Sequence, residues 1–232
     1  MIEAAGLTKI YGSVTALDGV DLSVPGRTIL TVLGPNGSGK TTLLRLLATL
    51  TRPTSGRGRI AGHDLVRDRA MVRRAIGLIG HGTQLYPDLT ALENLAFAAA
   101  LGGHRPPRSR LLGALARLGL EAQADLRVRD LSSGMQRRVA LARVVLREPS
   151  VLLLDEPFTG LDQESLKRWT EYLHAFKAGG GAVVLVTHSL GRGLELADRV
   201  AILAGGRLAV DQPRGSLTPE GLRQLYVTAT EP

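Results

Sequence analysis

The sequence predicts an α/β fold in which helices cover both faces of a largely parallel sheet. Largely apolar segments of strand length at 28–33, 75–80, 151–157 and 182–187 alternate with segments of helical periodicity, which is the pattern of such a sheet. The first of these segments leads through a glycine-rich turn into a helix. With 232 residues, 44 % of them hydrophobic, the chain is long enough to bury a substantial core.

The glycine-rich turn matches the phosphate-binding pattern G-x-x-x-x-G-K-[ST]. It consists of Gly34, Pro35, Asn36, Gly37, Ser38, Gly39, Lys40, Thr41 and Thr42. Its glycines permit turns that aim backbone N–H groups at anionic oxygens, and the following helix adds the positive end of its dipole. Lys40 is expected to reach the β- and γ-phosphates, and the Thr41 hydroxyl to ligate Mg²⁺. A chance glycine-rich turn is the alternative, and the strand–turn–helix setting argues against it.

Two further polar groups directly follow apolar strands. Asp155 and Glu156 end one strand, and His188 comes after the next. Because ligands bind at the carboxyl ends of parallel strands, we expect these side chains to lie beside the phosphate loop. Asp155 is suited to hold Mg²⁺ and Glu156 to polarise an attacking water. His188 is expected to contact the γ-phosphate, although a histidine satisfied at a strand end is the alternative.

The rest of the chain predicts two attachments to this core. Segments 2–11 and 14–24 read as strands of a small N-terminal antiparallel sheet, and Tyr11 beside their turn either stacks on an adenine ring or caps the sheet. Residues 90–146 read as mostly helical, beginning with a capping box between Thr90 and Glu93. Ser132 or Ser133 is the expected N-cap of the last helix in this region.

Composition excludes some classes of protein. The chain has no cysteine, so neither a disulfide framework nor a thiolate metal site is expected. No signal-peptide pattern opens it, and no apolar run approaches the roughly 20 residues of a membrane helix, which predicts a soluble cytoplasmic protein. The net charge of +8 fits nucleic acid, an anionic membrane surface or scattered solvated arginine. With aromatics at 3 % and no RNA- or DNA-binding motif, no nucleic acid partner is expected.

Several motifs together resemble the ATPase subunit of ABC transporters over nearly the whole chain. They are Gly34–Thr42, Leu131–Gln136, Leu154–Pro157, Gly160–Asp162 and His188. The segment Leu131–Gly134 is the most discriminating, because other phosphate-loop proteins lack it. The resemblance implies a P-loop NTPase with a RecA-like core in residues 1–82 and 149–232, and a helical subdomain in 83–148. It also implies ATP and Mg²⁺ as cofactors.

The resemblance further implies how the parts assemble. Two ATPase subunits, identical or sister copies, would form a head-to-tail dimer, and each ATP would lie between the phosphate loop of one subunit and Ser132, Ser133 and Gly134 of the other. Asp162 belongs to the segment that links the two sites, and Tyr11 matches the adenine-stacking aromatic. The dimer would sit on the cytoplasmic face of the membrane and drive a separate multi-span subunit that docks near residues 81–94.

Two positions depart from the family pattern. His81 stands where the family has a glutamine that senses Mg²⁺ and water, and Gln84 is a rival candidate for that role. A neutral imidazole accepts or ligates much as an amide oxygen does, so His81 is counted among the catalytic and metal-binding candidates. Met135 replaces a second glutamine, whose ribose contact is therefore in doubt.

The subfamily and the class of activity leave alternatives. Residues around His81 and the segment 89–95 resemble the haem-exporter ATPase of cytochrome c maturation, but exporters of drugs or polysaccharides share Gly134, Met135 and much of 89–95. A nucleic-acid-associated ATPase of the same fold usually carries coiled-coil insertions or two such modules, and neither is present here. A small-molecule kinase leaves Ser132–Gln136 unexplained. A transport ATPase is the expectation that accounts for all the motifs.

Overall fold

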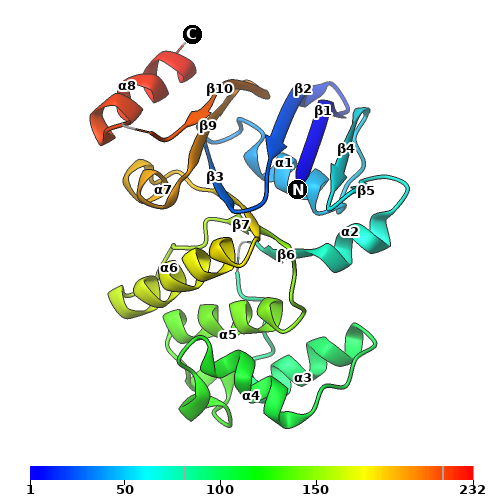
Figure 1. The fold of residues 1–232 in the computed structure, drawn as a ribbon, viewed down its shortest axis with the longest axis vertical. Helices are drawn as coiled ribbons and strands as arrows, with labels where there is room; N and C mark the ends of the chain where they lie inside the picture. Colours follow the sequence, from blue (N-terminus) through cyan, green and yellow to red (C-terminus); the bar gives the residue numbers. More distant parts are fainter. Residues whose placement is uncertain (81, 216, 232) are drawn as a thin grey trace.

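The computed structural model describes residues 1–80, 82–215 and 217–231, and it contains two sheets (Figure 1). The larger sheet has the strand order β10-β9-β3-β8-β7-β6. Its strands are β3 (Thr28–Leu33), β6 (Ile76–Ile79), β7 (Val151–Asp155), β8 (Ala182–Val186), β9 (Arg199–Ala204) and β10 (Arg207–Pro213). All neighbours are parallel except β9 and β10, so the expected parallel core is confirmed with one antiparallel strand at its edge.

The smaller sheet is antiparallel and has the order β2-β1-β4-β5. Its strands are β1 (Ile2–Tyr11), β2 (Val14–Val24), β4 (Ser55–Ile60) and β5 (His63–Asp64). The two N-terminal strands have the predicted bounds. By sequence alone a short strand is predicted around 59–61, but residues 55–60 pair along β1, so the strand begins earlier and is longer.

Eight labelled α-helices connect these strands. They are α1 (Lys40–Leu47), α2 (Arg69–Ala75), α3 (Ala91–Leu101), α4 (Arg108–Ala116), α5 (Ser133–Val145), α6 (Gln163–Ala178), α7 (Leu190–Leu196) and α8 (Pro219–Thr230). The sequence does not predict α2 and α7, which have seven residues each. By sequence alone the helix after the phosphate loop is predicted to span 40–50, whereas Thr49 adopts a left-handed φ of 56° just after α1 ends.

The core is divided by the central sheet, because successive residues of a strand face opposite sides. On one side Leu30 and Val32 pack with α1 and the antiparallel sheet. On the other side Ile29 joins the cluster that contains the buried residues of α3 to α6. In Figure 1, α3, α4 and α5 lie together below the sheet and α8 lies at the opposite end. Among the described residues, no helix combines the length and apolar character that a bilayer-spanning segment requires.

Candidate functional site

The glycine-rich loop follows β3 and ends at the first residue of α1. A Cβ at Gly34, where φ is 155°, would lie 2.2 Å from the carbonyl oxygen of Leu203. A Cβ at Gly39, where φ is 105°, would lie 2.4 Å from the carbonyl oxygen of Ala16. Both positions therefore need glycine for space as well as for conformation. The same short distances show that the loop packs against β9 and the start of β2.

Lys40 lies inside the loop that precedes it. Its ammonium donates hydrogen bonds of 2.8 Å to the carbonyl oxygens of Gly34 and of Pro35. Burial lowers the pKa of Lys40, while the nearby Glu156 and Asp155 carboxylates oppose that shift. The Lys40 ammonium and the start of α1 attract the anionic oxygens of a polyphosphate, and the two carboxylates lie where they can hold a cation bound to those oxygens.

Thr41 and Asp155 meet although 114 residues separate them in the chain. The Thr41 hydroxyl donates to Asp155 Oδ2 over 3.2 Å. Thr41 lies in the first turn of α1 and Asp155 is the last residue of β7, so the parallel sheet brings the two together as expected. A hydroxyl and a carboxylate oxygen are hard donors of the kind Mg²⁺ prefers.

Glu156 is held in one orientation by the residues that follow β8. Its Oε1 accepts from the backbone N–H of His188 at 2.7 Å and lies 2.7 Å from His188 Nδ1, and its Oε2 accepts from the Thr187 hydroxyl at 3.0 Å. The Glu156 side chain is 14 % exposed and the His188 side chain 72 % exposed. Glu156 also adopts a left-handed φ of 49°, which is uncommon for a residue with a side chain. The residues that follow β7 and β8 thus hold the Glu156 carboxylate in a fixed orientation near Lys40 of the loop.

Residues Ser132 to Gly134 lie elsewhere in the chain's own fold. Ser132 caps α5, since its hydroxyl accepts from the Met135 N–H at 3.2 Å. A Cβ on Gly134 would lie 2.5 Å from Ser165 Oγ and 3.0 Å from Asp162 Oδ2, so α5 begins against the start of α6. The Ser133 hydroxyl donates to the Gly160 carbonyl oxygen over 3.3 Å. Within the described part of the chain, no hydrogen bond joins these residues to the phosphate loop.

Asp162 has a structural role that the sequence analysis did not assign. It caps α6, with Oδ1 accepting from the Ser165 N–H at 2.7 Å, and this bond lowers the pKa of Asp162. Tyr11 is exposed at the end of β1, with the Lys9 ammonium 4.8 Å from its ring centre. The exposed ring is compatible with either of the two roles expected for it.

Of the two residues predicted to replace the family's glutamine, the structure describes only Gln84. His81 lies outside the described residues. Gln84, its rival, has a left-handed φ of 50°, and its carbonyl oxygen accepts from Arg143 over 2.7 Å. Arg143 also donates to the Thr83 carbonyl oxygen over 3.3 Å. The sequence gives no signal for Arg143, because the groups that it binds are backbone carbonyl oxygens. Thr187 was also not predicted, although its position directly after an apolar strand was an available signal.

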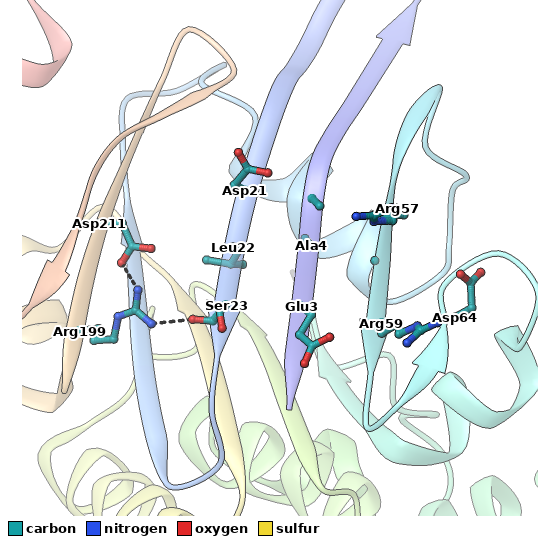
Figure 2. A pocket seen from close by; sticks show the side chains of 12 residues that line it. Glu3, Ala4, Asp21, Leu22, Ser23, Arg57, Arg59, Asp64, Arg199 and Asp211 are labelled. Carbon is teal, nitrogen blue, oxygen red and sulfur yellow. Dashed lines mark hydrogen bonds and ion pairs between the residues drawn. The ribbon is translucent and has the colours of Figure 1, made fainter.

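Another hollow, of about 620 Å³, lies on the antiparallel sheet and contains none of the predicted site residues. Figure 2 shows its charged side chains spread over β1, β2 and β4 and toward β9 and β10. Arg199 there donates to Asp211 and to the Ser23 carbonyl oxygen, both over 2.6 Å. Because its charges are of mixed sign and partly paired with each other, we do not assign it to the nucleotide.

Comparison with known proteins agrees with the geometry of the loop and strand ends. Residues 17–159 match the family model described as ABC transporter. The chain belongs to this family. It is an ABC-type ATPase domain, and its P-loop fold with an N-terminal antiparallel sheet is the one predicted.

The chain is similar to ATP-binding proteins of several transporters. It is 38 % identical to the daunorubicin/doxorubicin resistance ATP-binding protein DrrA of Streptomyces peucetius over 93 % of this chain and 66 % of that one. It is 35 % identical to the Nod factor export ATP-binding protein I of Ralstonia nicotianae over 95 % of this chain and 70 % of that one. The chain therefore spans about two thirds of the length of these relatives.

Solved structures show the same fold. A structure of the ATP-binding subunit of an ABC transporter superposes with a TM-score of 0.87 at 29 % identity, covering 99 % of both chains. The dimeric post-hydrolysis state of the ATP-binding cassette MJ0796 bound to ADP and Pi superposes with a TM-score of 0.81 at 28 % identity, covering 92 % of this chain and 99 % of that one.

Proposed function

We propose that this chain is the ATP-hydrolysing subunit of an ABC exporter and that it drives a separate membrane-spanning subunit from the cytoplasmic face. The observation that carries the proposal is the convergence of Lys40, Thr41, Asp155 and Glu156 at the carboxyl edge of one sheet, beside a loop whose glycines are sterically required. This arrangement supplies what phosphoryl transfer to water needs: a phosphate cradle, a cation site and a base.

In this proposal each group at the strand ends has one role. Backbone N–H groups of residues 34–42 and the Lys40 ammonium bind the phosphates, and Thr41 and Asp155 hold Mg²⁺. Thr41 and Asp155 would supply two oxygen ligands, and the ion would take its other ligands from the nucleotide and water. When bound, Mg²⁺ neutralises charge on the phosphates.

Glu156 is the general base in this proposal. Its two oxygens accept from Thr187 and from the His188 backbone, which fixes the carboxylate plane. The exposed His188 ring reaches the γ-phosphate only if its Nδ1 leaves Glu156 Oε1, and that movement frees a lone pair of Glu156 for a water proton. We keep His81 and Gln84 as alternative sensors of the ion and the water.

A second copy, or a sister subunit, completes each site in this proposal. Ser132, Ser133 and Gly134 begin a 13-residue helix and present N–H groups, yet none is bonded to the phosphate loop within the described part of the same chain. The start of α5 is braced against Asp162 and Ser165, which suits a surface that must bind an anion brought by another molecule. The MJ0796 structures, which are dimeric, support such an assembly.

The membrane subunit is proposed to dock in a groove beside the helical region, near the expected segment 81–94. This groove, of about 660 Å³, lies between α1, β6, α3 and α5. Four large exposed apolar side chains line it, of which Leu101 is 74 % exposed. They are Leu50, Tyr86, Phe97 and Leu101. Apolar side chains gathered in one groove fit the apolar face of a helix from a partner.

The groove is lined by both of the proposed parts of the chain. Its lining comes from the proposed core (1–82 and 149–232) and from the proposed helical subdomain (83–148). A partner bound there would be displaced by any movement of the core relative to the helical subdomain. ATP-driven closure of a dimer would therefore change the position of the membrane subunit.

For the cargo we propose a small amphipathic molecule that leaves the cell. DrrA and Nod factor export ATP-binding protein I support export, whereas a sulfate/thiosulfate import ATP-binding protein at 38 % identity shows that similarity alone does not decide direction. Haem export, expected from the residues around His81, is the alternative, and neither DrrA nor the Nod factor export protein lends it support.

The decisive test uses Glu156→Gln. The amide oxygen still accepts from Thr187 or His188 but no longer takes a proton, so hydrolysis should fall about 100-fold or more while ATP binding persists. We expect the variant to form an ATP-dependent dimer by size-exclusion chromatography with light scattering. Glu164→Gln, an exposed change on α6, is the matched control and should hydrolyse ATP normally. A variant that stays monomeric with ATP would contradict the shared site.

The cargo is tested separately, with the membrane subunit that co-purifies with this chain and is reconstituted with it. Stimulation of ATP turnover by an anthracycline but not by haem supports the drug-type exporter. The reverse result supports haem export and overturns the first choice.

A further inference from the structure

A strongly basic hollow lies next to the proposed docking groove. It has a volume of about 530 Å³ and is formed by the end of α3, the loop before α4 and the end of α5. Five arginines and one histidine line it, and no aspartate or glutamate among the described residues does. They are Arg74, Arg105, Arg110, Arg143, Arg147 and His104.

Most of this charge is not neutralised within the described part of the chain. Arg110 pairs with Glu148 over 3.3 Å, but both side chains are more than half exposed, so the pair is weak. Arg143 and Arg147 donate to backbone carbonyl oxygens, which orient a guanidinium without cancelling its charge. Arg74 and Arg105 have no ion pair among the described residues. The hollow therefore holds several guanidinium groups with unused donors.

The chemistry of the hollow points to phosphate. A guanidinium is planar and donates two parallel hydrogen bonds to a phosphate or carboxylate group. The hollow lacks the large exposed apolar side chains of the adjoining groove, so it is less suited to the apolar face of a helix than to a small group with several anionic oxygens. The two depressions share Ala98, Gly102, Arg143 and Arg147, so they adjoin on the same side of the molecule.

We propose that this arginine hollow binds the phosphate groups of anionic phospholipids at the membrane surface. The orientation rests on the proposed function, because a membrane subunit seated in the groove turns this side of the chain toward the bilayer. Arginines near an anionic leaflet each add to the attraction, and several acting together hold a peripheral protein at the surface. The chain would then approach the membrane through lipid contacts as well as through its partner.

The test measures binding of the purified full chain to lipid vesicles by co-sedimentation. Vesicles of phosphatidylcholine with about one third phosphatidylglycerol should retain the protein, and vesicles of phosphatidylcholine alone should not. Each arginine removed should weaken binding about fivefold, so the Arg74→Gln/Arg105→Gln double variant should bind on the order of 25-fold more weakly. Its basal ATP turnover should be unchanged, because neither residue touches the strand-end site.

Arg27→Gln/Arg214→Gln is the control, since it removes the same charge from two exposed arginines outside the hollow. It should keep vesicle binding within about twofold of the unchanged chain, as removal of charge away from the contact surface has little effect. Equal losses in the two double variants would show a general charge effect and overturn the proposal.

Two further outcomes would overturn the lipid assignment. If millimolar inorganic phosphate releases the protein from the vesicles at constant ionic strength, the site is one for soluble phosphate. If Arg74→Gln/Arg105→Gln keeps vesicle binding but no longer co-purifies with the membrane subunit in detergent, the hollow binds an acidic segment of that subunit.

A third measurement separates this proposal from the proposed function. Leu101→Asn places an uncharged polar side chain in the docking groove and should release the membrane subunit, while vesicle binding persists through the arginines. Loss of partner binding with retained vesicle binding supports two adjoining surfaces with separate ligands. Vesicle binding that disappears in Leu101→Asn as well would overturn the lipid site, whatever the fate of the ATPase proposal.

Discussion

The edge of the central sheet and the start of α5 differ in how complete they are within one chain. At the sheet edge, Lys40 and Thr41 come from α1 and Asp155 and Glu156 from the end of β7, and the four are linked by hydrogen bonds or by charge. At the start of α5, Ser133 and Gly134 pack, within the described part of the chain, against the first residues of α6 and the segment before it. In the proposed dimer, the first region is organised within one chain, whereas the second becomes part of a nucleotide site only when another copy binds.

The largest effect should come from Lys40→Ala, which changes the phosphate loop at the edge of the central sheet. The loop loses its only ammonium, together with the two bonds to the Gly34 and Pro35 carbonyl oxygens. ATP turnover should fall about 100-fold or more, and ATP affinity should fall with it, as measured by steady-state hydrolysis and by binding of a fluorescent analogue. Lys167→Ala on the exposed face of α6 is the control. Unchanged hydrolysis in Lys40→Ala would refute the site.

Ser132→Ala changes the start of α5 and tests whether Ser132 only caps the helix or also contributes to ATP hydrolysis. Removing the cap of α5 should cost about 1 kcal/mol of stability, and so should Thr218→Ala, which removes the equivalent cap of α8 far from the site. Only Ser132→Ala should also lower ATP turnover, by about tenfold, because only Ser132 would face the nucleotide of a second copy in the proposed dimer. Thermal unfolding and hydrolysis assays measure the two effects. Equal turnover in both variants would leave Ser132 a purely structural cap.

Arg143→Gln tests whether the two regions communicate. Arg143 lies on α5 and holds the Thr83 and Gln84 carbonyl oxygens, so it links the helix that begins at Ser132 to the loop after β6. Basal turnover should stay within about twofold, while stimulation by the membrane subunit should be largely lost, since the loop is no longer tied to the helix.

Arg147→Gln is the matched control for this variant. It removes the same charge from the same surface but breaks only the bond to the Arg73 carbonyl oxygen. A complex that responds to the membrane subunit equally in both variants would show that Arg143 does not transmit the signal.

The smallest effect should be the acid sensitivity carried by Asp162. The Ser165 N–H lowers the pKa of Asp162 in the folded chain below its ordinary value of 3.8, so the carboxylate stabilises the fold above that pH. This contribution is lost as the pH falls through the lowered pKa. Asp162→Asn keeps the cap without the charge, so its melting temperature should fall less between pH 4 and pH 2. An identical acid profile in both proteins would contradict this assignment.

The sequence predicted that these groups meet at the sheet edge because the signals are local. The P-loop glycines, Lys40 and Thr41 lie within eight consecutive residues, and Asp155, Glu156 and His188 lie at the ends of apolar strands or within two residues of them. Parallel strands bring such positions to one edge whatever the detailed packing. By contrast, the helices α2 and α7 were missed, since each has only seven residues and too few turns to show a periodicity.

Local sequence therefore determined the fold class, the phosphate loop and the cap at Thr90, and it limited the cap of α5 to Ser132 or Ser133, because these depend on a few neighbouring residues. Only the tertiary structure decided that Thr187 orients Glu156, that Arg143 holds the loop after β6, and that arginines from separate elements surround one hollow. Such contacts join residues tens of positions apart, often through backbone acceptors, and their geometry is set by how the elements pack. The roles of His81, Tyr11 and the division at residues 82 and 149 stay predictions.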